Sequence, residues 1–498
     1  MYDVLKTATE RVANLLTQGT PTNQLPLEIW TRIFGLAVDH GSKEHAKQVI
    51  PLTHVCRYWR TTLLSYPRMW STVHMKPGDP DVISEWLERS QGAPLTVVAE
   101  FTDFYKHPPC LYEDSATTTL AYNNDDEVCP RHEAILSLNQ LLPHRFRIHD
   151  LSILLHSSDP YWGDDEGDHM GEPTLLYHHF FRQSLPNLQR LDFCAVHVEQ
   201  TRYMIPIPDS LFANNLPRLT ELRYLGVARG LITTVKNLIS CEIGCWLDSA
   251  GPAILYPNEL QVFFENNKTI KSLTVNQSEL SFNDGGPLVP TVTAMANLQF
   301  FKIDCLFDLY LKKILNFIYV PQFKNLDTVQ LSLPLSTVEV VATDGSGHTF
   351  EFSRFSGHHQ NFCPLQHFGA VITTLRFDQE ITLERLGDEP HLYDLFLSFD
   401  AIQVLEFDGA IADFVQNALS VTGVFPGLKV IRVAVTRHEC KRTLQPLAIA
   451  SKRRMVEGNP LTAIEPLSED GGDRLDESLR VEWEECYNSE GMPDLLSG

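Results

Sequence analysis

The stretch LPNLQRLDFCAVHV, residues 185–198, decides the fold class of this chain. It places Leu188 two spacer residues ahead of Leu191, and then alternates apolar and polar side chains through Phe193. Such alternation predicts a β-strand with one buried face. The same arrangement recurs in LPRLTELRYLGVA from Leu216, KTIKSLTVNQSEL from Lys268, ANLQFFKIDCL from Ala296, KNLDTVQLSL from Lys324, AVITTLRFDQ from Ala370, FDAIQVLEFDG from Phe399 and PGLKVIRVAV from Pro426.

The spacing of these stretches predicts a repeating unit. Their first aliphatic residues are separated by steps of 31, 51, 28, 28, 46, 30 and 26 residues; they are Leu188, Leu219, Ile270, Leu298, Leu326, Ile372, Ile402 and Leu428. Five of the seven steps fall between 26 and 31, and the two longer ones leave room for insertions. Helical patterns between the strands predict an α/β fold with a parallel sheet.

The repeated pattern is similar to that of leucine-rich repeats, in which strands line one face of a solenoid and helices or loops return on the other. A consistent asparagine is missing from these repeats. The resemblance implies an irregular leucine-rich-repeat-like solenoid, and an ordinary α/β domain is the alternative.

A different pattern lies nearer the N-terminus, in LPLEIWTRIF from Leu25, LTHVCRYWR from Leu52 and YPRMWSTV from Tyr66. Pro26 suits the first turn of a helix, and Glu28 lies near the positive end of its dipole. Apolar residues then fill two adjacent lines of that helix: Ile29, Ile33 and Ala37 in one, and Trp30, Phe34 and Val38 in the other. A polar stretch up to Gln48 predicts a loop, and Pro51 is expected to restart a helix.

These motifs, in this order and spacing, resemble the F-box, and most closely the F-box-like proteins that are numerous in fungi. The resemblance extends through Ile83–Ser90 and Ala93–Val97, so it covers residues 23–101. It implies a trihelical module that binds the Skp-type adaptor of a cullin–RING ubiquitin ligase. The spacer from Asp39 to Ile50 is longer than in a compact box, which puts the placement of the first helix's contacts in doubt.

Carried over by position, the resemblance implies an adaptor-binding set: Leu25, Pro26, Ile29, Trp30, Ile33, Phe34, Val55, Cys56 and Trp59. Trp30 and Trp59 fit the core of the module as well as they fit a partner contact. The alternative is an ordinary helical subdomain whose apolar residues all face inward.

Composition narrows the function classes. The chain has 40 basic and 63 acidic residues among 498, a formal charge of −23, which repels phosphate backbones and argues against nucleic-acid binding. No window approaches about 18 uninterrupted apolar residues, so no membrane contact is expected. The N-terminal stretch does not have the pattern of a signal peptide, and the ten cysteines are sparse; we expect a cytoplasmic or nuclear protein.

Chemical motifs are weak throughout. Cys110, Cys129 and His132 lack the paired spacing of a zinc module, so no metal and no cofactor are predicted. Asp344-Gly-Ser346-Gly-His348 is not a Gly-x-Ser-x-Gly elbow, and its glycines indicate a turn. A hydrolase would need Ser346, His348 and a carboxylate to meet in one pocket.

The predicted organisation has four parts: an N-terminal helix at 1–22, the F-box at 23–75, a leucine-rich-repeat-like domain with inserted loops at 80–455, and an acidic tail or cap at 456–498. The loop at 343–363 is one of the expected insertions. The favoured hypothesis is a non-catalytic substrate receptor that links an unknown target protein to the ligase. The alternatives are a repeat scaffold with a vestigial box and a hydrolase of undetected class.

Overall fold

The computed structural model describes residues 25–38, 45–75, 80–102, 130–157, 179–197, 211–225, 229–244, 257–276, 292–304, 314–332, 337–355, 364–368, 370–378, 396–397, 399–421, 424–434 and 440–467. The predicted helix at 1–22 lies outside these ranges, as do most of the predicted loops. The chain divides into two compact units, one reaching Leu238 and the other beginning at Ile239. This boundary falls inside the single domain predicted for 80–455.

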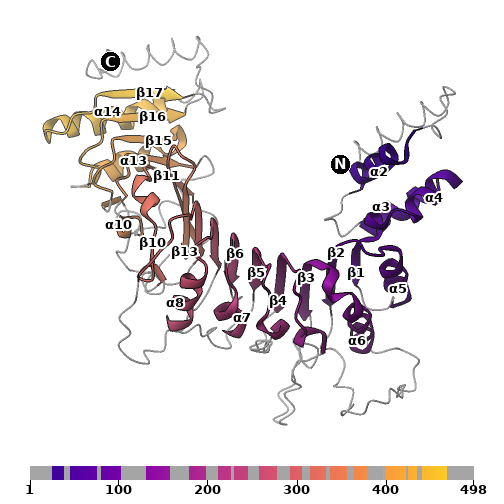
Figure 1. Ribbon diagram of the computed structural model, residues 1–498. Coiled ribbons are helices and arrows are strands. Elements are labelled where there is room, and N and C mark those ends of the chain that lie inside the picture. The colour runs from indigo at the N-terminus through magenta and orange to yellow at the C-terminus, as the bar shows by residue number, and fades with distance from the viewer. Residues whose placement is uncertain are drawn as a thin grey trace, which may run out of the picture. The chain divides into compact units, whose positions relative to one another are not determined.

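The first unit combines short helices with five parallel strands. Its strands pair in the chain order β1-β2-β3-β4-β5, side by side as Figure 1 shows. In sequence, its elements are α2 (Leu27–Ala37), α3 (His45–Leu52), α4 (Arg57–Leu64), η2 (Pro67–Trp70), β1 (Thr72–Met75), α5 (Pro80–Arg89), β2 (Leu95–Thr102), α6 (Pro130–Leu141), η3 (Leu142–Arg147), β3 (Ile148–Ser157), η4 (His179–Arg182), β4 (Arg190–His197), η5 (Leu211–Asn214), β5 (Glu221–Leu225) and α7 (Arg229–Thr234).

The second unit is built on ten strands. They pair in the order β6-β7-β9-β13-β12-β11-β14-β15-β16-β17, and all pairs are parallel except those of β12. Its elements are β6 (Ser240–Gly244), α8 (Pro257–Asn266), β7 (Ser272–Asn276), β8 (Thr293–Ala294), β9 (Phe300–Asp304), β10 (Ile318–Tyr319), η6 (Pro321–Asn325), β11 (Thr328–Ser332), β12 (Thr337–Thr343), β13 (Thr349–Phe355), α10 (Pro364–His367), β14 (Thr374–Phe377), β15 (Val404–Asp408), η7 (Gly409–Ile411), α13 (Ala412–Leu419), β16 (Val430–Ala434), α14 (Cys440–Val456) and β17 (Ala463–Leu467).

The predicted α/β class with a parallel sheet is confirmed. Each of the eight repeat residues named above is buried and lies two positions before a strand. The backbone N–H groups of Leu188, Leu219 and Leu428 close tight turns onto the carbonyl three residues earlier, at 3.1–3.2 Å. The next residue then bonds to the preceding strand; for example, the Lys429 N–H donates to Gln403 O at 2.9 Å. The anchor residue therefore sets both the turn and the start of each strand.

Two strands of this kind were not predicted. Leu238 precedes β6, and its burial explains half of the long step between Leu219 and Ile270. Leu461 precedes β17, where the Thr462 N–H donates to Lys429 O at 2.7 Å. The sheet therefore continues to Leu467, and placing the end of the domain at 455 was wrong.

The other long step contains an antiparallel hairpin, β12–β13. Thr349–Phe355 pairs with β9 on one side and with β12 on the other, so it lies inside the sheet. The prediction of a loop over 343–363 was therefore wrong for this part. Phe350 and Phe352 alternate with polar residues and bury the apolar face of the strand. The glycines of the turn hid that alternation.

The two faces of each sheet differ in burial. In the first unit, Val97, Leu151, Leu191 and Leu222 form one registered row, and each is at most 2% exposed. The connecting helices pack next to one another, α5 on α6 and η4 on η5, which accounts for a covered apolar face. The opposite face carries partly exposed polar residues at alternate positions.

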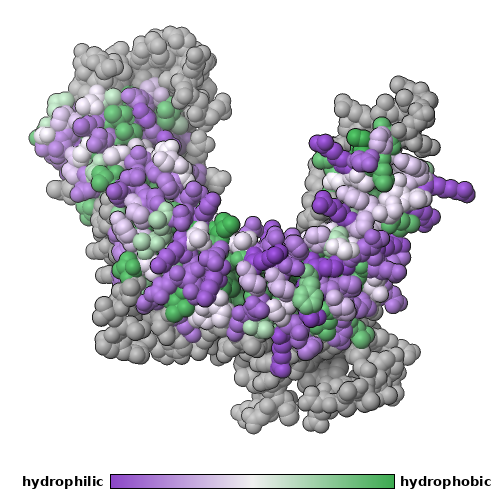
Figure 2. Space-filling model, viewed as in Figure 1, coloured by the Kyte–Doolittle hydropathy of each residue, from purple (hydrophilic) through white to green (hydrophobic). Residues whose placement is uncertain are grey.

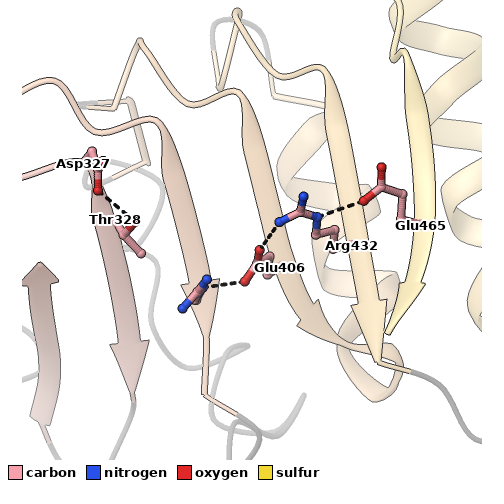
Figure 3. A network of polar contacts seen from close by, with 6 residues as sticks. Asp327, Thr328, Glu406, Arg432 and Glu465 are labelled. Atoms are coloured by element: carbon pink, nitrogen blue, oxygen red, sulfur yellow. Dashed lines mark hydrogen bonds and ion pairs between the residues drawn. The ribbon is translucent and has the colours of Figure 1, made fainter. Parts of the chain in front are cut away.

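A ladder of alternating charges crosses the polar face of the second unit. Glu406 accepts hydrogen bonds from Arg376 and, at 2.8 Å, from Arg432, which also donates to Glu465 at 2.9 Å (Figure 3). These four residues are direct neighbours in strand register from β14 to β17. Hydrogen bonds from Glu465 and then Glu406 raise the pKa of Arg432. The ladder balances charge across the last four strands.

Candidate protein-docking surface

Helix α2 presents two apolar stripes, and only one faces inward. Its first N–H groups are satisfied by Pro26 O, which accepts from Ile29 N at 3.0 Å. Trp30, Phe34 and Val38 are 2%, 1% and 4% exposed. Ile29 is 44% exposed and Ile33 partly exposed, so the line that they form points away from the module core.

An aromatic cluster holds α2 against α4. The ring of Trp59 lies 5.1 Å from both Trp30 and Phe34 between centroids, in edge-to-face geometry. The Tyr58 hydroxyl donates to Leu25 O at 3.5 Å and ties the start of α2 to the same helix. Trp30, Phe34 and Trp59 are therefore core residues of the module, and their predicted role as direct adaptor contacts is corrected.

The segment before α4 differs from the prediction. Helix α3 spans His45–Leu52, where a loop was expected, and Pro51 lies in its last turn instead of starting a new helix. The chain then turns, and Cys56 caps α4: its Sγ accepts from the Trp59 N–H at 3.4 Å. Val55 and Cys56 thus lie on an exposed turn and not on one face of a helix.

Exposed apolar side chains gather on this helical module. We define the apolar docking surface as the exposed residues of 25–55 with large apolar side chains, which are Leu25, Leu27, Ile29, Leu36, Ile50 and Val55. They are 39–82% exposed, Leu36 most of all. Figure 2 shows hydrophobic residues at the surface in the region of α2. A concentration of this kind on a short module indicates a protein contact.

Sequence reasoning found only part of this surface. Of the predicted set, the structure leaves Leu25, Pro26, Ile29, Val55 and Cys56 exposed and Ile33 partly exposed. Leu27, Leu36 and Ile50 were missed. Leu36 follows Ile29 by seven residues, a helical spacing that could have revealed it.

The module is fixed to the first strands of its unit. His45 on α3 shares a hydrogen bond with Met69 O at 3.1 Å, and the Trp70 Nε1–H donates to Leu63 O at 2.8 Å. Trp86 on α5 packs edge-to-face on Trp70, with centroids 4.9 Å apart. The Arg89 guanidinium covers the ring of Trp70 at 4.4 Å. These contacts hold α3 and α4 in a set position relative to β1 and α5.

The turn of the hairpin brings Asp344 and His348 together. One Asp344 oxygen accepts from the Ser346 and His348 backbone N–H groups at 2.8 and 3.0 Å, and the other lies 2.8 Å from His348 Nδ1. Burial raises the pKa of Asp344, but hydrogen bonds from His348 and Ser346 outweigh it and leave that pKa below its usual value. Ser346 contributes its backbone N–H to this arrangement, so the geometry is that of a turn stabilised by a carboxylate.

Asp344→Asn is expected to destabilise the second unit by about 1 kcal/mol at neutral pH, because an amide accepts these hydrogen bonds less strongly. A carboxylate with a depressed folded-state pKa contributes stability above its unfolded pKa, about 4, and loses it as pH falls through the folded value. Urea denaturation from pH 7 to pH 3 should show the two proteins converging in acid. Ser346→Ala is the control and should match the parent throughout. A constant difference at all pH values would contradict the role of the carboxylate.

Two further findings concern the described residues. No group of three histidine, cysteine or acidic side chains among them could hold a metal ion. No helix in these ranges is long and apolar enough to cross a membrane. Cys241, once considered as a ligand, is fully buried, and burial raises the pKa of its thiol.

Comparison with protein-family models and with curated proteins gave no match to this chain.

Proposed function

We propose that this chain is a non-catalytic substrate receptor of a ubiquitin ligase. Its helical module would act as an F-box on the Skp-type adaptor of a cullin–RING ligase. The strand-rich remainder, an irregular leucine-rich-repeat-like solenoid, would hold the target protein. The ligase would supply the chemistry to a target brought close to it.

One observation carries this proposal: the module separates its apolar residues into a core and a surface. The aromatic cluster of Trp30, Phe34 and Trp59 gives the module its own interior. Leu25, Ile29 and Val55 are then left 39–53% exposed, although burying such side chains is favourable by about 1.5–3 kcal/mol each. A partner that covers them would recover that free energy.

The revised contact set is Leu25, Pro26, Ile29, Ile33, Val55 and Cys56, together with the neighbouring Leu27 and Leu36. Arg32, Arg57 and Arg60 are also exposed in the same helices. The rim of the surface is therefore basic, in a chain whose overall charge is −23. An acidic rim on the adaptor would complement it.

The test is recovery of a purified Skp-type adaptor by the full chain. Leu25→Asp/Pro26→Asp should abolish recovery, because it places two charges in an apolar contact. The matched control is Val371→Asp/Val456→Asp, which adds the same charges at side chains that are 59% and 89% exposed in the second unit. The control should bind like the parent. Equal recovery by all three proteins would refute docking through this surface, and no recovery by any of them would favour a scaffold with a vestigial box.

A further inference from the structure

The polar face of the second unit's sheet is organised in registered rows that run across the strands. The row nearest the strand starts is uncharged and rich in hydroxyl groups, including Thr349, Thr343, Thr328 and Thr374. The middle row contains Lys302 and Glu351, which lie 3.6 Å apart, and ends in the charge ladder of Figure 3. Acids and bases alternate in this middle row.

The third row differs, because strand register places acids but no lysine or arginine in it. It runs through Asp304, Ser353, Glu339 and Ser332. Ser353 Oγ donates to Asp304, and Ser332 Oγ donates to Glu339 at 3.5 Å. Asp378 follows the end of β14, where its N–H donates to Leu331 O and so extends the row. We call these residues the acidic row.

The row lies on the uncovered side of the sheet. Asp304, Glu339 and Asp378 are partly exposed, whereas their neighbours on the other face, Ile303, Val340 and Phe377, are 0–7% exposed. An acidic row inside a charge-balanced face leaves negative potential there without a cation in register to offset it. A positively charged partner would complement it.

We propose that this face is the target-binding surface of the chain and that it takes an extended, basic segment of the target protein lying across the strands. The inference rests on the proposed receptor function and names the chemistry of the target. The adjoining charge ladder, which is neutral, marks where attraction for such a segment ends.

Strand spacing sets the pattern that the segment needs. Asp304 lies on β9, Glu339 on β12 and Asp378 beside β14, so successive acids are two strands apart in the sheet order. Two spacings between neighbouring strands are roughly 10 Å, which is also the length of about three residues of extended chain. Lysine or arginine at every third position would place one charge over each acid.

The test uses full-length protein and labelled twelve-residue peptides of lysine, serine and glycine in fluorescence anisotropy. One peptide has lysine at every third position, and the other has the same composition with its lysines in one block. The parent should bind the spaced peptide more tightly, and Asp304→Asn/Glu339→Gln should weaken that binding about tenfold or more. The matched control, Glu265→Gln/Asp413→Asn, removes two exposed acids from helices α8 and α13 and should bind within about twofold of the parent.

Equal loss in the two double variants, or equal binding of the two peptides, would overturn the proposal, because attraction would then depend on overall charge alone. Adaptor recovery on the same proteins separates this result from the docking proposal. Asp304→Asn/Glu339→Gln should still recover the adaptor, and Leu25→Asp/Pro26→Asp should still bind the spaced peptide. Thermal unfolding of each variant shows whether it is folded.

Discussion

Trp59→Ala is expected to release α2 from α4 and to lower the stability of the helical module by about 3–5 kcal/mol. Trp59 is 9% exposed, and its ring contacts both Trp30 and Phe34. No other side chain of α4 reaches both rings in the recorded aromatic contacts of the described residues. Alanine would leave a cavity that three short helices cannot close by collapsing. Hydrogen exchange of residues 27–64 should therefore speed up, while β2 and β3 keep their protection.

Val55→Ala is the matched control, because Val55 is 53% exposed and only four residues away. It should change the unfolding free energy by less than about 0.5 kcal/mol. Adaptor recovery should fall with both variants, through unfolding for Trp59 and through lost contact for Val55. Loss of adaptor recovery by Trp59→Ala with unchanged hydrogen exchange would instead make Trp59 a direct contact.

Phe350→Ala is expected to have an effect of similar size, about 3–5 kcal/mol, on the second unit. Phe350 is fully buried in β13, and its ring lies 5.1–5.9 Å from those of Phe301, Phe323, Phe352 and Phe368. These partners come from four different segments, so the cavity would weaken the hairpin, β9 and the return segments together. Chemical denaturation followed by tryptophan-independent far-UV circular dichroism measures the loss.

Val341→Ala serves as the control for Phe350→Ala. Val341 lies in the neighbouring strand β12 but on the polar face, where it is partly exposed. Its replacement should cost less than about 1 kcal/mol. Similar losses for the two variants would mean that the aromatic cluster does not organise this part of the sheet.

Local pattern predicted the sheet well, because each strand carries its own signal. Leu188, Leu191 and Phe193 repeat a spacing that also starts the other predicted strands. The strand β6 has the same spacing in Leu238, Cys241 and Ile243, but a cysteine stands at its centre. In β17 the pattern is shortened by Pro466 and followed by acidic residues. The pairing of β13 with β9 joins residues 49 apart, such as Thr349 and Phe300, and no local signal encodes it.

The docking surface was harder to predict for a physical reason. Both apolar lines of α2 fit a buried stripe, and only the position of Trp59 in the folded module decides that Trp30 and Phe34 turn inward. Cysteine is not among the usual helix caps, so the role of Cys56 and the turn before it gave no sequence signal.

The hairpin β12–β13 has a consequence for the order of folding. Along the chain β11 follows β9, yet the two strands never pair, because β13 and β12 lie between them. The strands from β6 to β9 form one parallel block, and those from β11 and β14 to β17 form another. The blocks can be joined only after residue 355 has been synthesised and the hairpin has closed. The seam therefore has the highest contact order among the neighbouring pairs around it, and we expect it to be the slow step in completing this sheet.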